Sequence, residues 1–153
     1  MIVPVVKETI VSPLSAEEVH TRLQTIVKRG RSTRWNPEEH LFMGKLKPNQ
    51  FDISRILIRP ENFMPRIQGR IEESSKGSIL FLRYTLEFST RMFYIFWSLS
   101  ALFFALFLWF YETHLYMSIF ALVALIANIL ITHINFHRHK TKSRKLLLSV
   151  LDL

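Results

Sequence analysis

Residues 92–111 read MFYIFWSLSALFFALFLWFY and residues 115–136 read LYMSIFALVALIANILITHINF, with only Glu112, Thr113 and His114 between them. Neither segment contains Asp, Glu, Lys, Arg, Gly or Pro. A hydrocarbon core about 30 Å thick requires about twenty apolar residues at a rise of about 1.5 Å each. Without Pro or Gly, each segment can satisfy its backbone hydrogen bonds within one helix, as lipid requires. The sequence therefore predicts a transmembrane helical hairpin with spans at 92–111 and 115–136.

A buried helix pair in the core of a soluble protein is the alternative interpretation of these segments. Helices of that kind carry a polar face toward solvent. Neither segment has such a face, so we favour the membrane hairpin.

The charged residues are divided unevenly around the hairpin. The formal net charge is +8; residues 1–91 hold 15 Lys/Arg against 10 Asp/Glu, and residues 137–153 hold five against one. Cations that border a span mark the cytoplasmic side of a membrane, so we expect a multi-pass membrane protein with both termini in the cytoplasm. The cations nearest the spans are expected to contact lipid headgroups: Arg91, Arg138, Lys140, Lys142, Arg144 and Lys145.

Two kinds of side chain within the spans suggest contacts beyond lipid. Asn128 lies near the middle of the second span, where a polar group is expected to bond across helices, with Ser98 and Ser100 as candidate partners. Large aromatic faces pack well against neighbouring helices but also suit lipid. The candidate contacts with another membrane subunit are Phe93, Phe96, Trp97, Phe103 and Phe104.

The first thirty residues predict a strand followed by a capped helix. Residues 3–11 are rich in β-branched side chains and are typical of a strand. Ser15 and Glu18 have the spacing of a capping box, which starts a helix predicted over 16–29 and stopped by Gly30.

The remaining soluble segments alternate between apolar and polar residues. Strands are predicted at 40–46, 51–59, 63–72 and 79–88, separated by turn residues. A short basic helix over 140–152 is expected to return to the sheet, because so short a helix is marginal alone.

These elements predict an α+β fold. Its small antiparallel sheet has about five strands, with one N-terminal and one C-terminal helix, and a transmembrane hairpin interrupts it. The predicted divisions are 1–91, a cytoplasmic domain; 92–136, the hairpin; and 137–153, the basic C-terminal helix.

Residues 60–72 read PENFMPRIQGRIE, and they are followed by a GS-I hairpin and by the strand RYTLEF, which leads into an aromatic-rich span containing Trp97. The pattern, N-F-x-P-x-I-x-G-x-I before a two-helix hairpin and a basic terminal helix, resembles a widespread group of small, uncharacterised bacterial two-span membrane proteins. The likeness covers roughly residues 42–150. It implies a bacterial inner-membrane protein and adds no activity. The element order also resembles START-like helix-grip domains, an analogy of fold alone.

Few residues suggest a metal, cofactor or nucleic-acid site. His133 and His137 share a helix face and could bind a metal or haem, with His139 nearby, but the first span offers no matching histidine. We interpret them as interfacial histidines. A second cluster, Arg29, Arg31, Arg34 and Trp35, could bind nucleic acid or headgroups, although a solvated loop is the preferred interpretation. The chain has no cysteine and four glycines, so we predict no cofactor, no metal, no nucleic acid and no enzymatic activity.

Three functions remain open from the sequence. The first is a membrane-anchored, non-catalytic interaction module, an accessory subunit of a larger inner-membrane complex that contacts lipids and other membrane subunits. The second is the binding of a lipid or small apolar ligand between the sheet and its helices. The third is a pore-forming effector that oligomerises through the aromatic spans. No small-molecule substrate is identified.

Overall fold

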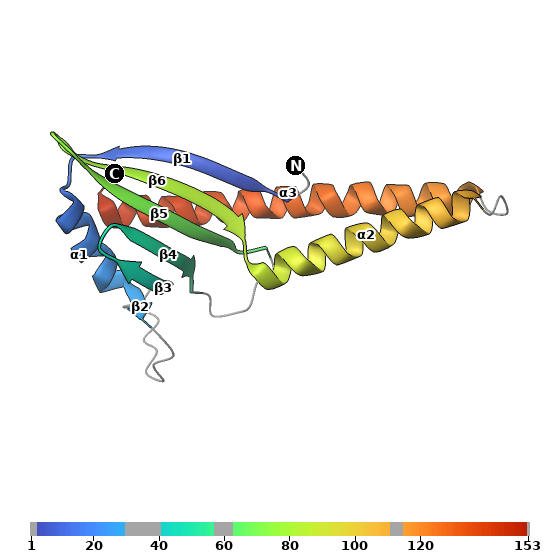
Figure 1. Ribbon diagram of the computed structural model, residues 1–153, viewed down its shortest axis with the longest axis horizontal. Coiled ribbons are helices and arrows are strands. Elements are labelled where there is room, and N and C mark those ends of the chain that lie inside the picture. The colour runs from blue at the N-terminus through green and yellow to red at the C-terminus, as the bar shows by residue number, and fades with distance from the viewer. Residues whose placement is uncertain (1–2, 30–40, 57–62, 111–114, 153) are drawn as a thin grey trace.

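A computed structural model describes residues 3–29, 41–56, 63–110 and 115–152. Its fold is α+β, as predicted (Figure 1). The predicted cluster residues Arg31, Arg34 and Trp35 and the loop between the spans lie outside the described residues.

Six strands form one sheet within the described part of the chain, in the order β1-β6-β5-β4-β3-β2. Their bounds are β1 Val5–Ser12, β2 Val27–Arg29, β3 Phe42–Lys47, β4 Gln50–Arg55, β5 Pro65–Ser74 and β6 Gly77–Leu86. Strand β2 pairs with β3 in parallel, and the other neighbours are antiparallel. The sheet therefore has one strand more than predicted and is mixed rather than purely antiparallel.

The additional strand comes from a segment predicted as helix. Helix α1 covers Ala16–Ile26 and stops four residues before Gly30. Val27 takes extended backbone angles and pairs with Phe42, and its side chain is buried in the core. A β-branched residue fits a pleated, half-buried edge well, so pairing with β3 prevails over continuing the helix.

The predicted start of α1 is confirmed atom by atom. Glu18 donates its backbone N–H to Ser15 Oγ at 3.2 Å, and Ser15 donates its own backbone N–H to Glu18 Oε2 at 2.8 Å. Both halves of the capping box are therefore present.

The hairpin consists of helix α2, Phe88–Phe110, and helix α3, Leu115–Leu151. The separate helix predicted at 140–152 is instead the last third of α3, which runs unbroken for 37 residues. No Gly or Pro occurs between Leu115 and Leu151, and Arg and Lys are good helix formers. Nothing in the local sequence therefore interrupts the helix where it leaves the apolar segment.

One face of the sheet is covered by α1 and the C-terminal part of α3 (Figure 1). Val19 and Leu23 of α1 and Phe136 and Leu147 of α3 are fully buried against it. The sheet contributes the inward-facing residues of its central strands: Phe42, Phe51, Ile53, Ile67, Ile71, Leu80, Leu82, Tyr84 and Leu86. No helix among the described residues covers the other face of the sheet, and α2 and the first part of α3 project together away from the domain (Figure 1).

Candidate binding face and membrane hairpin

Both hairpin helices are long and apolar enough to cross a membrane. Only 17% of the most apolar window of α2 and 11% of that of α3 are buried. A helix pair in a soluble core would bury most of these side chains, whereas lipid can cover them. The exposure of the hairpin therefore supports membrane insertion.

Small and polar side chains form the seam between α2 and α3. Ser118 Oγ donates to the backbone oxygen of Ala105 at 2.9 Å, and Asn128 Nδ2 donates to Ser98 Oγ at 3.2 Å. Ser98 is therefore a partner of Asn128, as predicted. The other candidate, Ser100, is half-buried. Small residues let helix backbones approach closely, and polar pairs join helices in lipid.

The candidate aromatic contacts point away from this seam. Phe93, Phe96, Trp97, Phe103 and Phe104 are each more than half exposed. The rings of Phe93 and Phe96 each meet Trp97 edge-on, with centroids 5.9 and 5.8 Å apart. The five residues therefore form an outward aromatic surface on α2, available to lipid or to another helix.

The structure divides the six cations predicted at the headgroups into two groups. Arg138, Lys142 and Lys145 are exposed on α3. The other three have contacts within the chain. The Arg91 guanidinium lies over the Phe88 ring at 5.5 Å, the Lys140 ammonium lies over the Tyr84 ring at 5.4 Å, and Arg144 pairs with Glu8 at 2.6 Å.

Tyr84 lies at the centre of the junction between the sheet and α3. Its side chain is fully buried. Burial, followed by the neighbouring Glu8 carboxylate, holds the pKa of Tyr84 well above its ordinary value. Tyr84 therefore stays neutral, while Glu8 and Arg144 supply the charges that join β1 to α3.

His133 and His137 line a small pocket of about 120 Å³ with Val3, Pro4 and Val5 at the start of the chain's first strand. Within the described ranges, no three His, Cys, Asp or Glu side chains are grouped so that they could hold a metal ion. The histidines of α3 lie where its apolar part reaches the sheet.

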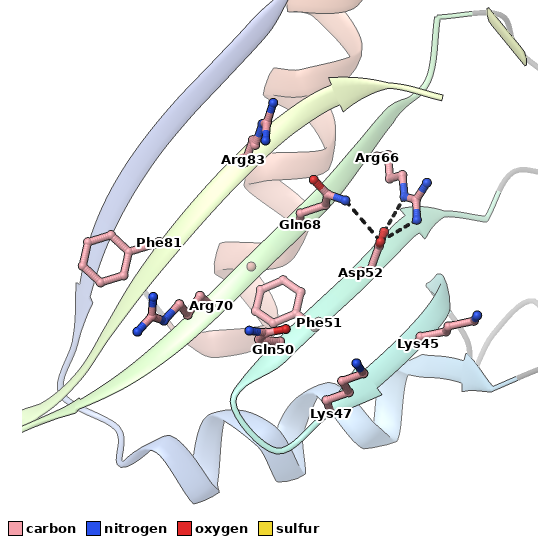
Figure 2. Close-up of a pocket in the computed structure, with 11 residues that line it drawn as sticks. Lys45, Lys47, Gln50, Phe51, Asp52, Arg66, Gln68, Arg70, Phe81 and Arg83 are labelled. Carbon is pink, nitrogen blue, oxygen red and sulfur yellow. Dashed lines mark hydrogen bonds and ion pairs between the residues drawn. The ribbon is translucent and has the colours of Figure 1, made fainter. Parts of the chain in front are cut away.

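The core side chains pack between the sheet and its helices, which is the region where the sequence leaves an apolar ligand as an alternative. A hollow of about 500 Å³ lies on the opposite, open face of the sheet. Strand alternation places the polar residues of four strands there. Figure 2 shows the lining residues, which are Lys45, Lys47, Gln50, Phe51, Asp52, Arg66, Gln68, Gly69, Arg70, Phe81 and Arg83.

The charge of this hollow is strongly positive. Five Lys and Arg side chains line it, against the single carboxylate of Asp52. Arg66 holds that carboxylate with two hydrogen bonds, Nε to Oδ1 and Nη2 to Oδ2, each at 2.5 Å, and Gln68 adds a third at 3.3 Å (Figure 2). Burial opposes ionisation of Asp52, but these hydrogen bonds outweigh it, and the pKa of Asp52 lies below its ordinary value.

Strand register decides which of these side chains are neighbours. Lys45 pairs with Asp52, Asp52 with Gln68, and Gln68 with Arg83, so one row of residues crosses β3, β4, β5 and β6. A second row contains Lys47, Gln50, Arg70 and Phe81 in the same way. The first row places Asp52 and Gln68 between Lys45 and Arg83. The second places Gln50 between Lys47 and Arg70, and Phe81 at its end is 41% exposed.

The sequence did not single out this face. The alternation of Arg66, Gln68 and Arg70 with buried residues correctly predicts a solvated side of β5. The cations of β3 and β6 join them only through the register in which these consecutive strands pair, and the alternation within one strand does not set that register. The signal that could have found the face is the outward cations recurring on three predicted strands.

Comparison with protein-family models, curated proteins and solved structures found no match.

Proposed function

We propose that this protein is a non-catalytic interaction module anchored in the bacterial inner membrane, where it serves as an accessory subunit of a larger membrane complex. The proposal includes cytoplasmic termini and a folded domain that presents its open face away from the bilayer.

The observation that carries the proposal is the continuity of α3. A helix of 37 residues is about 55 Å long, which exceeds the apolar core of a bilayer by about 25 Å. The excess supports the sheet, because Phe136, Leu147 and Leu151 of α3 are buried in the domain core. The domain is therefore joined to its anchor by a packed helix, and it cannot rotate as it would on a flexible linker.

A fixed orientation suits docking more than it suits simple tethering. Strand β6 ends at Leu86 and α2 begins at Phe88, so the second connection to the hairpin is equally short. Two short connections hold the open face and the aromatic surface of α2 in a constant relation to each other. A complex can then contact both surfaces at once, which raises its affinity through effective concentration.

The test is native mass spectrometry of the full chain extracted from its own membrane in a mild detergent. We expect a protein partner at fixed stoichiometry. Recovery of the wild type only as a single chain with bound lipids would contradict the accessory-subunit proposal.

A variant series then locates the membrane contact. The triple substitution Phe96→Leu, Trp97→Leu and Phe103→Leu keeps α2 apolar while removing its aromatic surface. The matched control is Tyr116→Leu with Phe120→Leu, two exposed aromatics of α3. Loss of the partner from the triple variant alone would assign the contact to α2, and retention would assign recognition to the domain.

A further inference from the structure

We propose that the open sheet face, defined by Lys45, Lys47, Arg70, Phe81 and Arg83, binds an extended acidic segment of a partner protein. The inference rests on the proposed function and names the chemistry of its partner. The lining of this hollow has five cations and one carboxylate, and Arg66 already neutralises that carboxylate. Arg70 pairs with Glu72 at 2.8 Å beside the hollow. Lys45, Lys47 and Arg83 therefore carry the excess of positive charge that an anionic partner would complement.

The spread of the cations requires a long ligand. Strands β3 and β6 are separated by β4 and β5, so Lys45 and Arg83 stand about 14 Å apart at about 4.8 Å per strand. A single phosphate or carboxylate cannot reach both. Arg70 and Arg83 are diagonal neighbours on adjacent strands, because Arg70 pairs with Phe81, and diagonal neighbours lie about 7–8 Å apart. An extended chain with acidic residues at alternate positions has a similar repeat.

The neutral residues between the cations suit a peptide. Gln50 and Gln68 place amides between Lys47 and Arg70 and between Asp52 and Arg83, respectively. An amide both donates and accepts hydrogen bonds, so it can pair with the N–H and C=O groups of an extended backbone. The exposed ring of Phe81 adds an apolar contact for one side chain of the segment.

A lipid headgroup lies too far away to be the anion. Arg83 precedes the start of α2 at Phe88 by five residues, which corresponds to about 17 Å of strand. Strands β5 and β6 extend from the hairpin alongside α3 (Figure 1), so this length leads away from the membrane. The headgroup layer is only about 5–7 Å thick on each side.

Nucleic acid is a weaker fit than an acidic peptide. Sheets that bind single-stranded RNA stack two or three bases on aromatic side chains. Among the outward residues of the described strands, Phe81 is the one aromatic side chain.

The experiment uses the full chain in lipid nanodiscs made with uncharged phosphatidylcholine. The probe is a fluorescent twelve-residue peptide of alternating Glu and Ser, and its anisotropy is followed on titration with the protein. We expect saturable binding that weakens as the salt concentration rises. The same peptide with Gln in place of Glu should not bind.

Two variants with the same charge change locate the site. Arg83→Glu reverses an exposed cation within the hollow, and Lys76→Glu reverses an exposed cation in the turn between β5 and β6. We expect Arg83→Glu to weaken binding at least about tenfold, since it opposes like charges, and Lys76→Glu to change it less than about twofold. Equal thermal stability of both proteins shows that the sheet remains folded.

Three results would overturn the inference: no binding of the Glu peptide by the wild type, equal loss in the two variants, or tighter binding of single-stranded DNA of the same length. If a partner stays bound to the Arg83→Glu protein in native mass spectrometry, the open face is not its binding site, and the accessory-subunit proposal is unaffected. If the wild type carries no protein partner in native mass spectrometry but still binds the Glu peptide, the accessory-subunit proposal is contradicted and the binding site on the open face is supported.

Discussion

Arg144 on α3 donates a hydrogen bond from Nε to Oε1 of Glu8 on β1, at 2.6 Å. The two residues are 136 positions apart in the chain, and each side chain is largely shielded from solvent, with 39% and 21% exposure. This ion pair ties the edge strand of the sheet to the helix that leaves the membrane, beside the buried Tyr84.

Removal of either partner should destabilise the domain, because the other charge is left partly buried without its counterion. We expect Glu8→Gln and Arg144→Met each to lower the free energy of unfolding by about 1–3 kcal/mol. The double variant should lose less than the sum of the two. The exposed pair Arg70–Glu72 is the control, since Glu72→Gln should cost about 1 kcal/mol or less. Denaturant unfolding in detergent, followed by circular dichroism, measures all four proteins.

The capping box should act as one unit. Ser15→Ala removes the acceptor for the Glu18 N–H and should cost about 1 kcal/mol, while Glu18→Ala should cost less. Because the two residues share one motif, the double variant should fall short of the sum of the single effects. Additive shifts in thermal midpoint would show that the two hydrogen bonds contribute independently.

Gly69 is required by the ring that lies over it. A Cβ at this position would stand 2.0–2.5 Å from three atoms of the Phe51 ring, which is itself 3% exposed. Gly69→Ala should therefore destabilise the protein by about 1–3 kcal/mol through overpacking. Phe51→Leu shortens the opposing side chain, so adding Gly69→Ala to that variant should cost clearly less. A cost of equal size in both backgrounds would place the strain elsewhere.

The ionised carboxylate of Asp52 should contribute to stability at neutral pH, and this contribution should be lost in acid. Hydrogen bonds from Arg66 and Gln68 hold its pKa below the ordinary value in the folded state. Such a group stabilises the fold above its unfolded pKa of about 3.9, and this contribution is lost as the pH falls through the lower, folded pKa. The stability of the wild type should therefore fall more steeply below about pH 4 than that of Asp52→Asn. Parallel curves for the two proteins would contradict a folded-state pKa shift at this residue.

The proposed orientation of the hairpin rests on the basic residues that flank it. A cysteine introduced at Thr113, in the loop between the spans, should react with a membrane-impermeant maleimide in intact cells. A cysteine at Ser149, on the exposed side of α3, should react only after the cells are opened. The chain has no native cysteine, so the labelling needs no background variant. Labelling of Ser149→Cys alone in intact cells would invert the proposed topology.

Local physics explains what the sequence determined by itself. The two apolar segments are too long and too uniform for anything but helices that expose apolar surface. Ser15 and Glu18 interact over a single turn, so their spacing alone predicts the start of α1. The alternation around Ile67 places one side of β5 in the core and the other in solvent, whatever strand lies next to it.

Pairing between distant segments explains what only the tertiary structure decided. Val27 is extended rather than helical because Phe42 offers it a neighbouring strand. Arg144 pairs with Glu8 because α3 continues unbroken beyond the hairpin and packs against the sheet. The cations of the open face become one surface only when β3, β4, β5 and β6 pair in register, since a shift of one residue would turn every one of them toward the core.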